Sequence, residues 1–433
     1  MRTEFFSETL GERYQKIEHS SGLTVYVFPK KLTTSYAVLA THYGSINNAF
    51  RSDGERGVTA VPDGIAHFLE HKLFENEDGS DSFERFAALG ADANAYTSYE
   101  RTAYLFSCTE HFDACLEELL RFVTHPHFTD ASVAKEQGII AQEIREYEDS
   151  PWERCFQNLL EAMYRSHPIR NNICGSVESI GAITPDLLNT CYRVFYRPSN
   201  MVLAVCGDLD PDAVMATVDR ILPPASEPSA IERVFPEEPA VVERTYVEER
   251  MPVSKPIFSI GIKDPSVPTD PKARFLRDMT LALLDDVLFS RAGEFYSSLF
   301  EEGVITPNFA GGYSCADGFG FHCISGESET PELVLERLRA YLDRVCREGI
   351  PEEDFERCRR VMYADELRAF DSTEEIASRL VSYALDGVEL FSYLPILQSI
   401  RREDAEALLR EAFREELFTL SVIRRAEENG AEE

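Results

Sequence analysis

Apolar residues are grouped in short runs that predict both strands and helices. Runs rich in β-branched and aromatic residues, typical of strands, occupy 22–30, 35–43, 91–98, 101–109 and 200–206. Longer stretches with apolar residues three or four apart predict helices. We expect helices over 63–74 with Asp63 as N-cap, over 80–89 ending at Gly90, and over 110–196 with breaks at Pro126, Pro151 and Pro168.

The same order of elements recurs in the second half of the chain. Strands are predicted over 255–263, 306–314, 318–326 and 417–423, and helices over 272–302 and 330–415. Two segments also resemble each other in sequence, because 128–144 matches 351–367 at an offset of 223 and 82–90 matches 295–303 at an offset of 213. The pattern predicts two diverged copies of one α+β unit.

Prolines mark the join between the two copies. They cluster at 223, 224, 228, 236 and 239, which is typical of a linker. We therefore predict a first domain over 1–222, a linker over 223–245 and a second domain over 246–433. A length of 433 residues suits two domains, and a hydrophobic fraction of 44% is enough for two cores.

Charge and composition exclude some classes of function. The net charge is −33, from 43 basic and 76 acidic residues, so the surface should repel nucleic acid and anionic membranes. No run of eighteen apolar residues occurs and the first residues lack an apolar signal core, so we expect a soluble cytoplasmic protein. The ten cysteines form no C-x-x-C pair, which argues against a cysteine zinc site. Several of them, such as Cys108 and Cys206, lie in apolar runs and indicate small buried hydrophobes in a reducing compartment.

The segment His67-Phe68-Leu69-Glu70-His71 carries the strongest chemical signal. It has the form H-x-x-E-H, the inverted zinc-protease motif. On a helix its two imidazoles stand one turn apart on the same face and can reach one metal ion. Glu70 lies on that face, where it can contact a water at the metal. The alternative is a helix with two ordinary histidines.

A carboxylate is needed to complete such a site. The helix expected at about 130–148 has an apolar stripe of Val133, Ile140, Ile144 and Tyr147, and Glu136 and Glu143 fall on or beside it. A carboxylate that faces a core is costly unless it binds a metal or is hydrogen-bonded. We therefore predict Glu143 as the third ligand and Glu136 as the carboxylate that orients a histidine or Glu143. The residues leave open that both glutamates are solvated on a slightly rotated helix.

Together these segments resemble the pitrilysin/insulinase/mitochondrial-processing-peptidase family of inverzincin zinc peptidases. His67 to His71 is followed, after 71 intervening residues, by Glu143, and Gly90-Ala91-Asp92-Ala93-Asn94-Ala95-Tyr96-Thr97 resembles the family's substrate-binding edge strand. The segments Tyr147–Pro151, His167-Pro168 and Gly175–Ile180 are closer to the zinc-bearing subunit of the bacterial two-subunit members. The similarity is dense in the first half and weak in the second. At the position equivalent to the motif, the second half has approximately the segment Thr280–Leu284.

The resemblance implies zinc-dependent endopeptidase activity on short or unfolded peptides. His67, His71 and Glu143 would hold zinc (Zn²⁺), and Glu70 would be the general base. The peptide would bind as an added β-strand whose backbone contacts Asn94 and Ala95. Each domain would be a mostly antiparallel sheet with helices on one face, and the two would form half of a clamshell.

One segment departs from the family's pattern. Members with a complete second half carry an Arg followed, seven residues on, by a Tyr, but Leu299–Phe309 has neither at the expected places. We therefore expect a partner subunit, a paralogue without zinc ligands, to supply the pair in a heterodimer, with a homodimer as the alternative. The alternative function is a non-catalytic scaffold or a peptide-binding subunit of a peptidase-like complex. Neither nucleic acid nor membrane is an expected partner.

Overall fold

The computed structural model describes residues 1–52, 57–224 and 230–426. The chain divides into two compact units, each built from separate segments. Unit 1 comprises Met1–Ile144, Asn172–Phe235 and Asp365–Tyr393, and unit 2 comprises Arg145–Asn171, Pro236–Ala364 and Leu394–Glu433.

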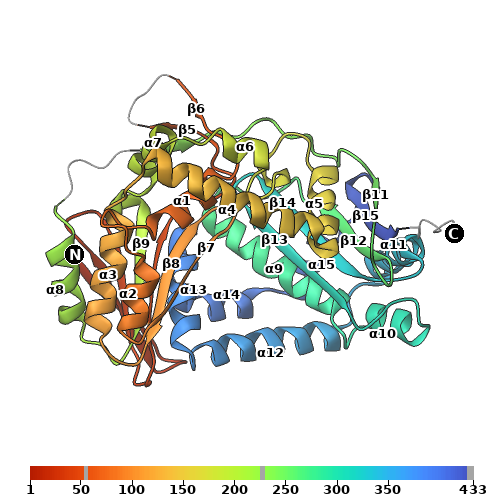
Figure 1. The fold of residues 1–433 in the computed structure, drawn as a ribbon. Helices are drawn as coiled ribbons and strands as arrows, with labels where there is room; N and C mark the ends of the chain where they lie inside the picture. Colours follow the sequence, from red (N-terminus) through yellow and green to blue (C-terminus); the bar gives the residue numbers. More distant parts are fainter. Residues whose placement is uncertain (53–56, 225–229, 427–433) are drawn as a thin grey trace. The chain divides into compact units, whose positions relative to one another are not determined.

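Unit 1 contains a seven-stranded sheet in the order β1-β2-β3-β9-β4-β8-β7. Figure 1 shows three of its strands, β9, β8 and β7. The neighbours are antiparallel except β3 and β9, which run parallel. The strands are β1 (Arg2–Ser7), β2 (Glu12–Glu18), β3 (Thr24–Pro29), β4 (Ser35–Thr41), β7 (Asp92–Thr97), β8 (Thr102–Cys108) and β9 (Met201–Gly207). A small second sheet joins β5 (Ala49–Ser52), β6 (Thr59–Ala60) and β10 (Ile231–Arg233). Strand β7, on which peptide binding is predicted, is the last strand of the large sheet.

Helices cover both faces of this sheet. One face packs into the larger core cluster of the unit, with the helices α1 (Ile65–Leu73), α2 (Ser82–Ala88), α3 (Phe112–Thr124), α4 (Asp130–Asp149), α6 (Val177–Gly181), α7 (Pro185–Phe195) and α8 (Pro211–Ile221). The short helix η2 (Pro198–Asn200), which has no buried residue, leads into β9. The opposite face packs against α13 (Thr373–Leu385) and η3 (Leu390–Ser392), where Ile376 and Leu380 join Val38 and Ala204 in a second cluster. We expected helices on one face of the sheet, so the second layer of helices on the opposite face was not predicted.

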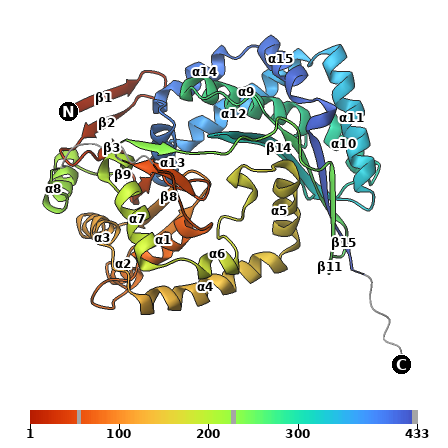
Figure 2. The same ribbon diagram turned by 90° about the horizontal axis from the view of Figure 1, so that it is seen from above.

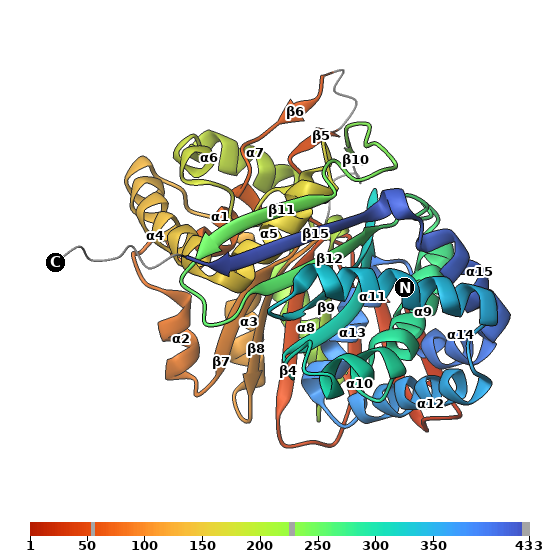
Figure 3. The same cartoon turned by 90° about the vertical axis from the view of Figure 1, so that its right-hand side faces the viewer.

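Unit 2 contains a five-stranded sheet in the order β11-β15-β12-β14-β13. Its strands are β11 (Tyr246–Met251), β12 (Ile257–Lys263), β13 (Phe309–Ala316), β14 (Phe319–Glu327) and β15 (Phe418–Arg425). Figure 3 shows β11 and β15 side by side, and they form the one parallel pair among these strands.

Helices pack on both faces of this sheet as well. Gly261 lies directly beneath α5, because a Cβ added to it would meet the Met163 side chain at 2.2 Å, whereas Gly311 faces Phe289 of α9. The helices of the unit are α5 (Pro151–Met163), η1 (Pro168–Arg170), α9 (Pro271–Phe289), α10 (Glu294–Glu301), α11 (Pro331–Glu348), α12 (Glu352–Ala369, whose last residues belong to unit 1), α14 (Tyr393–Ser399), α15 (Arg402–Ala412) and η4 (Glu415–Leu417).

The two sheets confirm the predicted duplication. The order β3-β9-β4-β8-β7 recurs as β11-β15-β12-β14-β13, with the parallel pair at the same place in each. The copies exchange helices, because α5 comes from the first half of the sequence and packs on the second sheet, while α13 does the reverse. The compact units are therefore not contiguous in sequence. The division at 222 and 245 stays a prediction, and residues 225–229 of the proposed linker lie outside the described residues.

Two local expectations need correction. The first strands, β1 and β2, come from residues that we did not assign to any element. Asp63 does not cap the motif helix, because that helix begins at Ile65 after Gly64, which adopts φ 87° and provides no side-chain cap. Asp63 instead accepts a hydrogen bond from Asn48 Nδ2 at 2.8 Å.

Across the described residues, no single helix is long and apolar enough to span a membrane. Two consecutive helical segments, Thr373–Leu385 and Leu390–Ser399, have the length and apolar composition of a membrane span only when they are taken together, and they are bent by 91° relative to each other.

Candidate metal centre

The short helix α1 carries the three residues of the predicted motif. All its residues except His71 are buried, and His67 and Glu70 are 7% and 8% exposed. The rings of His67 and His71 are 4.5 Å apart. Figures 1 and 2 show α4 passing beside α1 in unit 1. Glu143 of α4 is close to both rings.

Glu143 faces both imidazoles at the spacing of metal ligands. Its Oε1 lies 3.6 Å from His67 Nε2, and its Oε2 lies 3.6 Å from His71 Nε2. Both distances are too long for hydrogen bonds. Ligand atoms about 2.0–2.1 Å from a tetrahedral zinc ion stand about 3.3 Å from one another. Each of the two imidazole nitrogens therefore lies from a Glu143 oxygen at about the separation of two ligands of one zinc ion.

Glu136 contacts the far side of the His71 ring. Its Oε1 lies 3.1 Å from His71 Nδ1, and Glu136 is 8% exposed. With the proton on Nδ1, His71 donates to this carboxylate and keeps the Nε2 lone pair directed at Glu143. Sequence reasoning assigned Glu136 this kind of orienting contact, and the structure places it within reach of His71.

The two histidines are in opposite electrostatic environments. Burial, followed by the nearby charge of His71, lowers the pKa of His67 to about 3, so its ring is neutral. Burial also lowers the pKa of His71, but the hydrogen bond and charge of Glu136, with the charges of Glu70 and Glu143, outweigh it and leave that pKa raised. The surplus of carboxylates around His71 is the environment that a cation would neutralise.

Glu70 is held by a residue that we did not single out from the sequence. Thr97 Oγ1 donates to Glu70 Oε2 at 2.7 Å. Burial raises the pKa of Glu70, and although the Thr97 hydrogen bond and the charge of His71 oppose it, the net pKa is raised. Thr97 lies in the strand predicted at 91–98, but only the tertiary fold reveals its contact with α1.

The predicted substrate residues lie in the same cavity as the motif. A cavity of about 440 Å³ is lined by Glu70, His71 and Glu136, by Asn94 and Ala95 of β7, and by Phe74, Glu75, Gly79, Ser80, Asp81, Phe83, Lys135 and Ile139. The Ala95 N–H donates to Asn94 Oδ1 at 2.8 Å rather than to β8, so this N–H points out of the sheet edge.

Cys174 is a further ligand-type residue at this centre. Its Sγ lies 3.9 Å from His67 Nε2, and one ligand atom from each of His67, Glu143 and Cys174 fits within 4.8 Å of the others. We did not single out this residue among the cysteines of the sequence. Its place depends on a contact 107 residues away along the chain, which no spacing in the sequence reveals.

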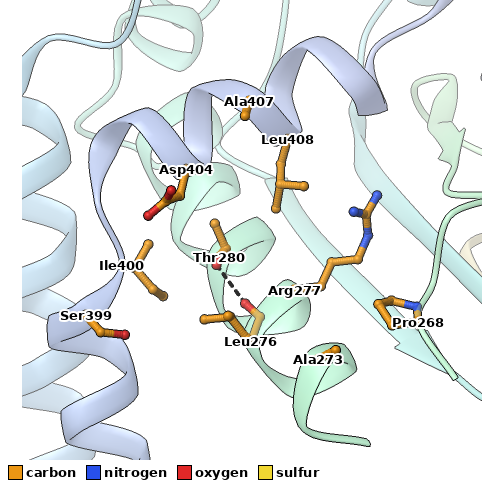
Figure 4. A pocket seen from close by; sticks show the side chains of 10 residues that line it. All are labelled: Pro268, Ala273, Leu276, Arg277, Thr280, Ser399, Ile400, Asp404, Ala407 and Leu408. Carbon is orange, nitrogen blue, oxygen red and sulfur yellow. Dashed lines mark hydrogen bonds between the residues drawn. The ribbon is translucent and has the colours of Figure 1, made fainter. Parts of the chain in front are cut away.

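At the corresponding place the second copy has the sequence Thr280–Leu284, which contains neither histidine nor glutamate. Thr280 of α9, at the position that aligns with His67, donates its hydroxyl hydrogen to Leu276 O at 2.7 Å. Figure 4 shows both residues beside a cavity of about 410 Å³ whose side chains come mainly from α9 and α15. The charged Arg277 at this cavity is already paired with Asp264 and Glu411.

Comparison with known proteins agrees with the fold and places the chain in a family. Residues 54–177 match the family Insulinase (Peptidase family M16), and residues 182–362 match the Peptidase M16 inactive domain. A Bacillus subtilis (strain 168) protein named as the uncharacterized zinc protease YmfH is 40% identical over 419 residues, covering 96% of this chain and 97% of that protein. The chain belongs to peptidase family M16, the pitrilysin/insulinase family.

Solved structures share the whole fold. One from Alicyclobacillus acidocaldarius, described as M16-like, has a TM-score of 0.91 and 38% identity and covers 95% of this chain and 98% of its own. A Helicobacter pylori protease has a TM-score of 0.82 at 17% identity over 95% of this chain and 99% of its own, which is a likeness of fold. The match described as inactive covers the part of the chain without the motif, whereas His67 to Glu143 lies within the insulinase match.

Proposed function

We propose that this chain is the zinc-bearing subunit of a metalloendopeptidase that cleaves peptides bound along β7. The observation that carries the proposal is the position of Glu143, whose two carboxylate oxygens each face one histidine Nε2 at 3.6 Å. Three protein ligands leave a fourth position for water, as in catalytic zinc sites. His67, His71 and Glu143 would hold the ion.

Glu70 has the position and environment of a general base. When bound, zinc would acidify a water molecule and stabilise the oxyanion of the attacked carbonyl. Glu70 takes the proton from this water and later passes it to the leaving amine. Its raised pKa suits proton uptake, and the Thr97 hydrogen bond fixes which of its oxygens faces the site. The net reaction adds one water across a peptide bond.

The edge strand β7 supplies the peptide-binding surface in this proposal. An extended peptide adds as a strand and takes the outward Ala95 N–H from the Asn94 side chain. Backbone pairing gives affinity without a strict sequence rule. Short or unfolded peptides are therefore the expected substrates.

A partner chain completes the site in this proposal. The segment Leu299–Phe309 lacks the Arg and the Tyr that stabilise the oxyanion in related two-domain enzymes, and a homodimer would lack them as well. A paralogue without zinc ligands would supply both groups, which in a dry site contribute strongly to transition-state stabilisation. We expect full activity only in the heterodimer.

Zinc content tests the ligand set. We expect about one zinc per wild-type chain and much less in Glu143→Ala, with wild-type content in Glu148→Ala, which alters an exposed glutamate of the same helix. Cleavage of an unstructured fluorogenic peptide, measured with and without the co-purified partner, then tests the activity. A folded wild type without zinc would overturn the proposal and favour the scaffold or peptide-binding alternative.

A further inference from the structure

We propose that the thiolate of Cys174 is a fourth zinc ligand in the peptide-free protein and closes the position that water needs. This inference rests on the proposed zinc site and adds a resting state to it. Its starting point is the cluster of His67, Glu143 and Cys174, in which one ligand atom from each lies within 4.8 Å of the other two.

The backbone around Cys174 is held tightly against the start of α1. Gly64, three residues before His67, adopts φ 87°, and a Cβ there would meet the Cys174 carbonyl oxygen at 2.4 Å. Gly175, with φ 78°, approaches the Asp63 carbonyl in the same way, because a Cβ added to Gly175 would lie 2.5 Å from the Asp63 carbonyl oxygen. Glycine is the residue that permits both conformations and both approaches. The two chain segments therefore form one fixed junction next to the histidines.

Hydrogen bonds fix the same loop from its other side. The Cys174 N–H donates to Asn172 Oδ1 at 2.8 Å, and Ser179 Oγ donates to the Asp63 carbonyl at 2.8 Å. Because the backbone on both sides is held, the place of the Cys174 Cβ is set by the fold, and rotation about its one side-chain torsion moves the sulfur. Cys174 is 5% exposed, and its sulfur faces the His67 ring.

The distances suit a thiolate ligand. A sulfur about 2.3 Å and a nitrogen about 2.0 Å from a tetrahedral zinc ion are about 3.5 Å apart, and Cys174 Sγ and His67 Nε2 are 3.9 Å apart before any metal draws them together. Other buried cysteines have different surroundings, as Cys155 illustrates, since its Sγ lies against the carbonyls of Ile257 and Ser421. Cys174 instead faces a nitrogen that the proposal makes a ligand.

Ligation by Cys174 would change the state of the centre. On binding, the thiol loses its proton to solvent and the sulfur takes the fourth position, which gives the closed coordination typical of structural zinc. Before cleavage, water must replace the sulfur, and the thiolate regains a proton. The peptide-free subunit would thus hold its zinc tightly and be inactive until this exchange.

X-ray absorption spectroscopy of the zinc-loaded full chain tests the inference without an activity measurement. We expect one sulfur neighbour at about 2.3 Å in the wild type and only nitrogen and oxygen neighbours in Cys174→Ala. Cys206→Ala, which alters a fully buried cysteine of β9, should keep the sulfur neighbour. Replacement of zinc by Co²⁺ should give a thiolate-to-cobalt charge-transfer band in the wild type and in Cys206→Ala, but not in Cys174→Ala.

Affinity provides the second measurement. Loss of the ligand should weaken zinc binding by about tenfold or more in Cys174→Ala, with no change in Cys206→Ala. A wild type whose zinc has only nitrogen and oxygen neighbours, with equal affinity in Cys174→Ala, overturns this inference and leaves the proposed function standing. A folded wild type that binds neither zinc nor cobalt overturns both.

Discussion

His71 Nδ1 lies 3.1 Å from Glu136 Oε1, while Nε2 of the same ring faces Glu143 Oε2 at 3.6 Å. The two glutamates are seven residues apart on α4, which is about two helical turns. One imidazole therefore contacts two carboxylates of the same helix, one through each nitrogen. The contact with Glu136 fixes the orientation and the tautomer that the contact with Glu143 requires.

Removing Glu136 should weaken zinc binding without removing a ligand. In Glu136→Ala the His71 ring loses the acceptor for its Nδ1 proton, and the zinc dissociation constant should rise by about 10- to 100-fold. Competition with a fluorescent chelator measures it. Glu146→Ala, on the exposed side of the same helix, is the matched control and should bind zinc as the wild type does. Equal affinities in both variants would refute the orienting role.

Glu70→Gln should separate catalysis from metal binding. The amide cannot accept the proton from water, so kcat should fall by about 10²- to 10⁴-fold. The zinc content should stay at the wild-type level, because Glu70 is not among the proposed ligands. Elemental analysis and peptide cleavage on the same preparation measure both. Loss of zinc together with activity would mean that Glu70 has been assigned the wrong role.

The sequence revealed those parts of the site that depend on local spacing. His67, Glu70 and His71 share one helical face, and Glu143 was chosen because it falls beside an apolar stripe. That stripe was only partly right, since Tyr147 is 38% exposed. Thr97 and Cys174 escaped notice because β7 and the loop after residue 172 reach α1 only through the tertiary fold.

The same distinction explains what was found and missed in the fold. The order of elements and the duplication follow from periodicity and internal resemblance. The exchange of α5 and α13 between the two sheets does not, because the apolar face of an amphipathic helix does not specify which sheet it covers. The N-cap at Asp63 failed because the chain must pass Cys174 closely, and this requires glycine at position 64.

Replacing each of two glycines by alanine should have opposite effects on the stability of the fold. Gly64→Ala places a methyl group 2.4 Å from the Cys174 carbonyl oxygen at a positive φ, which should destabilise the fold by about 1–3 kcal/mol. Gly138 lies in the middle of α4, on its solvent-exposed side, with open space around it. Gly138→Ala should therefore stabilise the folded state by about 0.5–1 kcal/mol. Thermal unfolding measures both. Equal melting temperatures for the two variants would contradict the tight junction.

A buried ion pair should contribute to the stability of unit 2. Asp264 accepts two hydrogen bonds from Arg277, at 2.8 and 2.9 Å, and one from Tyr313 at 2.6 Å. Asp264→Asn removes the buried carboxylate that is paired with Arg277 and leaves this guanidinium only the half-exposed Glu411 at 3.1 Å, so it should cost up to about 3–5 kcal/mol. Denaturant unfolding at pH 7 measures this, with Asp343→Asn, at an exposed position of α11, as a control that should change little.

The effect of Asp264 should depend on pH. Burial raises the pKa of Asp264, but the bonds from Arg277 and Tyr313 outweigh it and hold the pKa below the ordinary 3.8. A carboxyl group whose pKa is lower in the folded state than in the unfolded state stabilises the folded state fully at pH values above its unfolded-state pKa. This contribution is lost as the pH falls through its folded-state pKa. The difference between wild type and Asp264→Asn should therefore be constant above about pH 5 and shrink in stronger acid. A constant difference down to pH 2 would contradict the assignment.

Ala95→Pro should test how a peptide binds at β7. The Ala95 N–H bonds to the Asn94 side chain and not to β8, so proline removes a donor on the outer edge and leaves the ladder to β8 in place. One lost backbone hydrogen bond of about 0.5–1.5 kcal/mol predicts a KM raised by about 2- to 12-fold. Zinc content and melting temperature should stay near the wild type. Unchanged KM in a folded, zinc-loaded variant would mean that the peptide does not pair with this edge at Ala95.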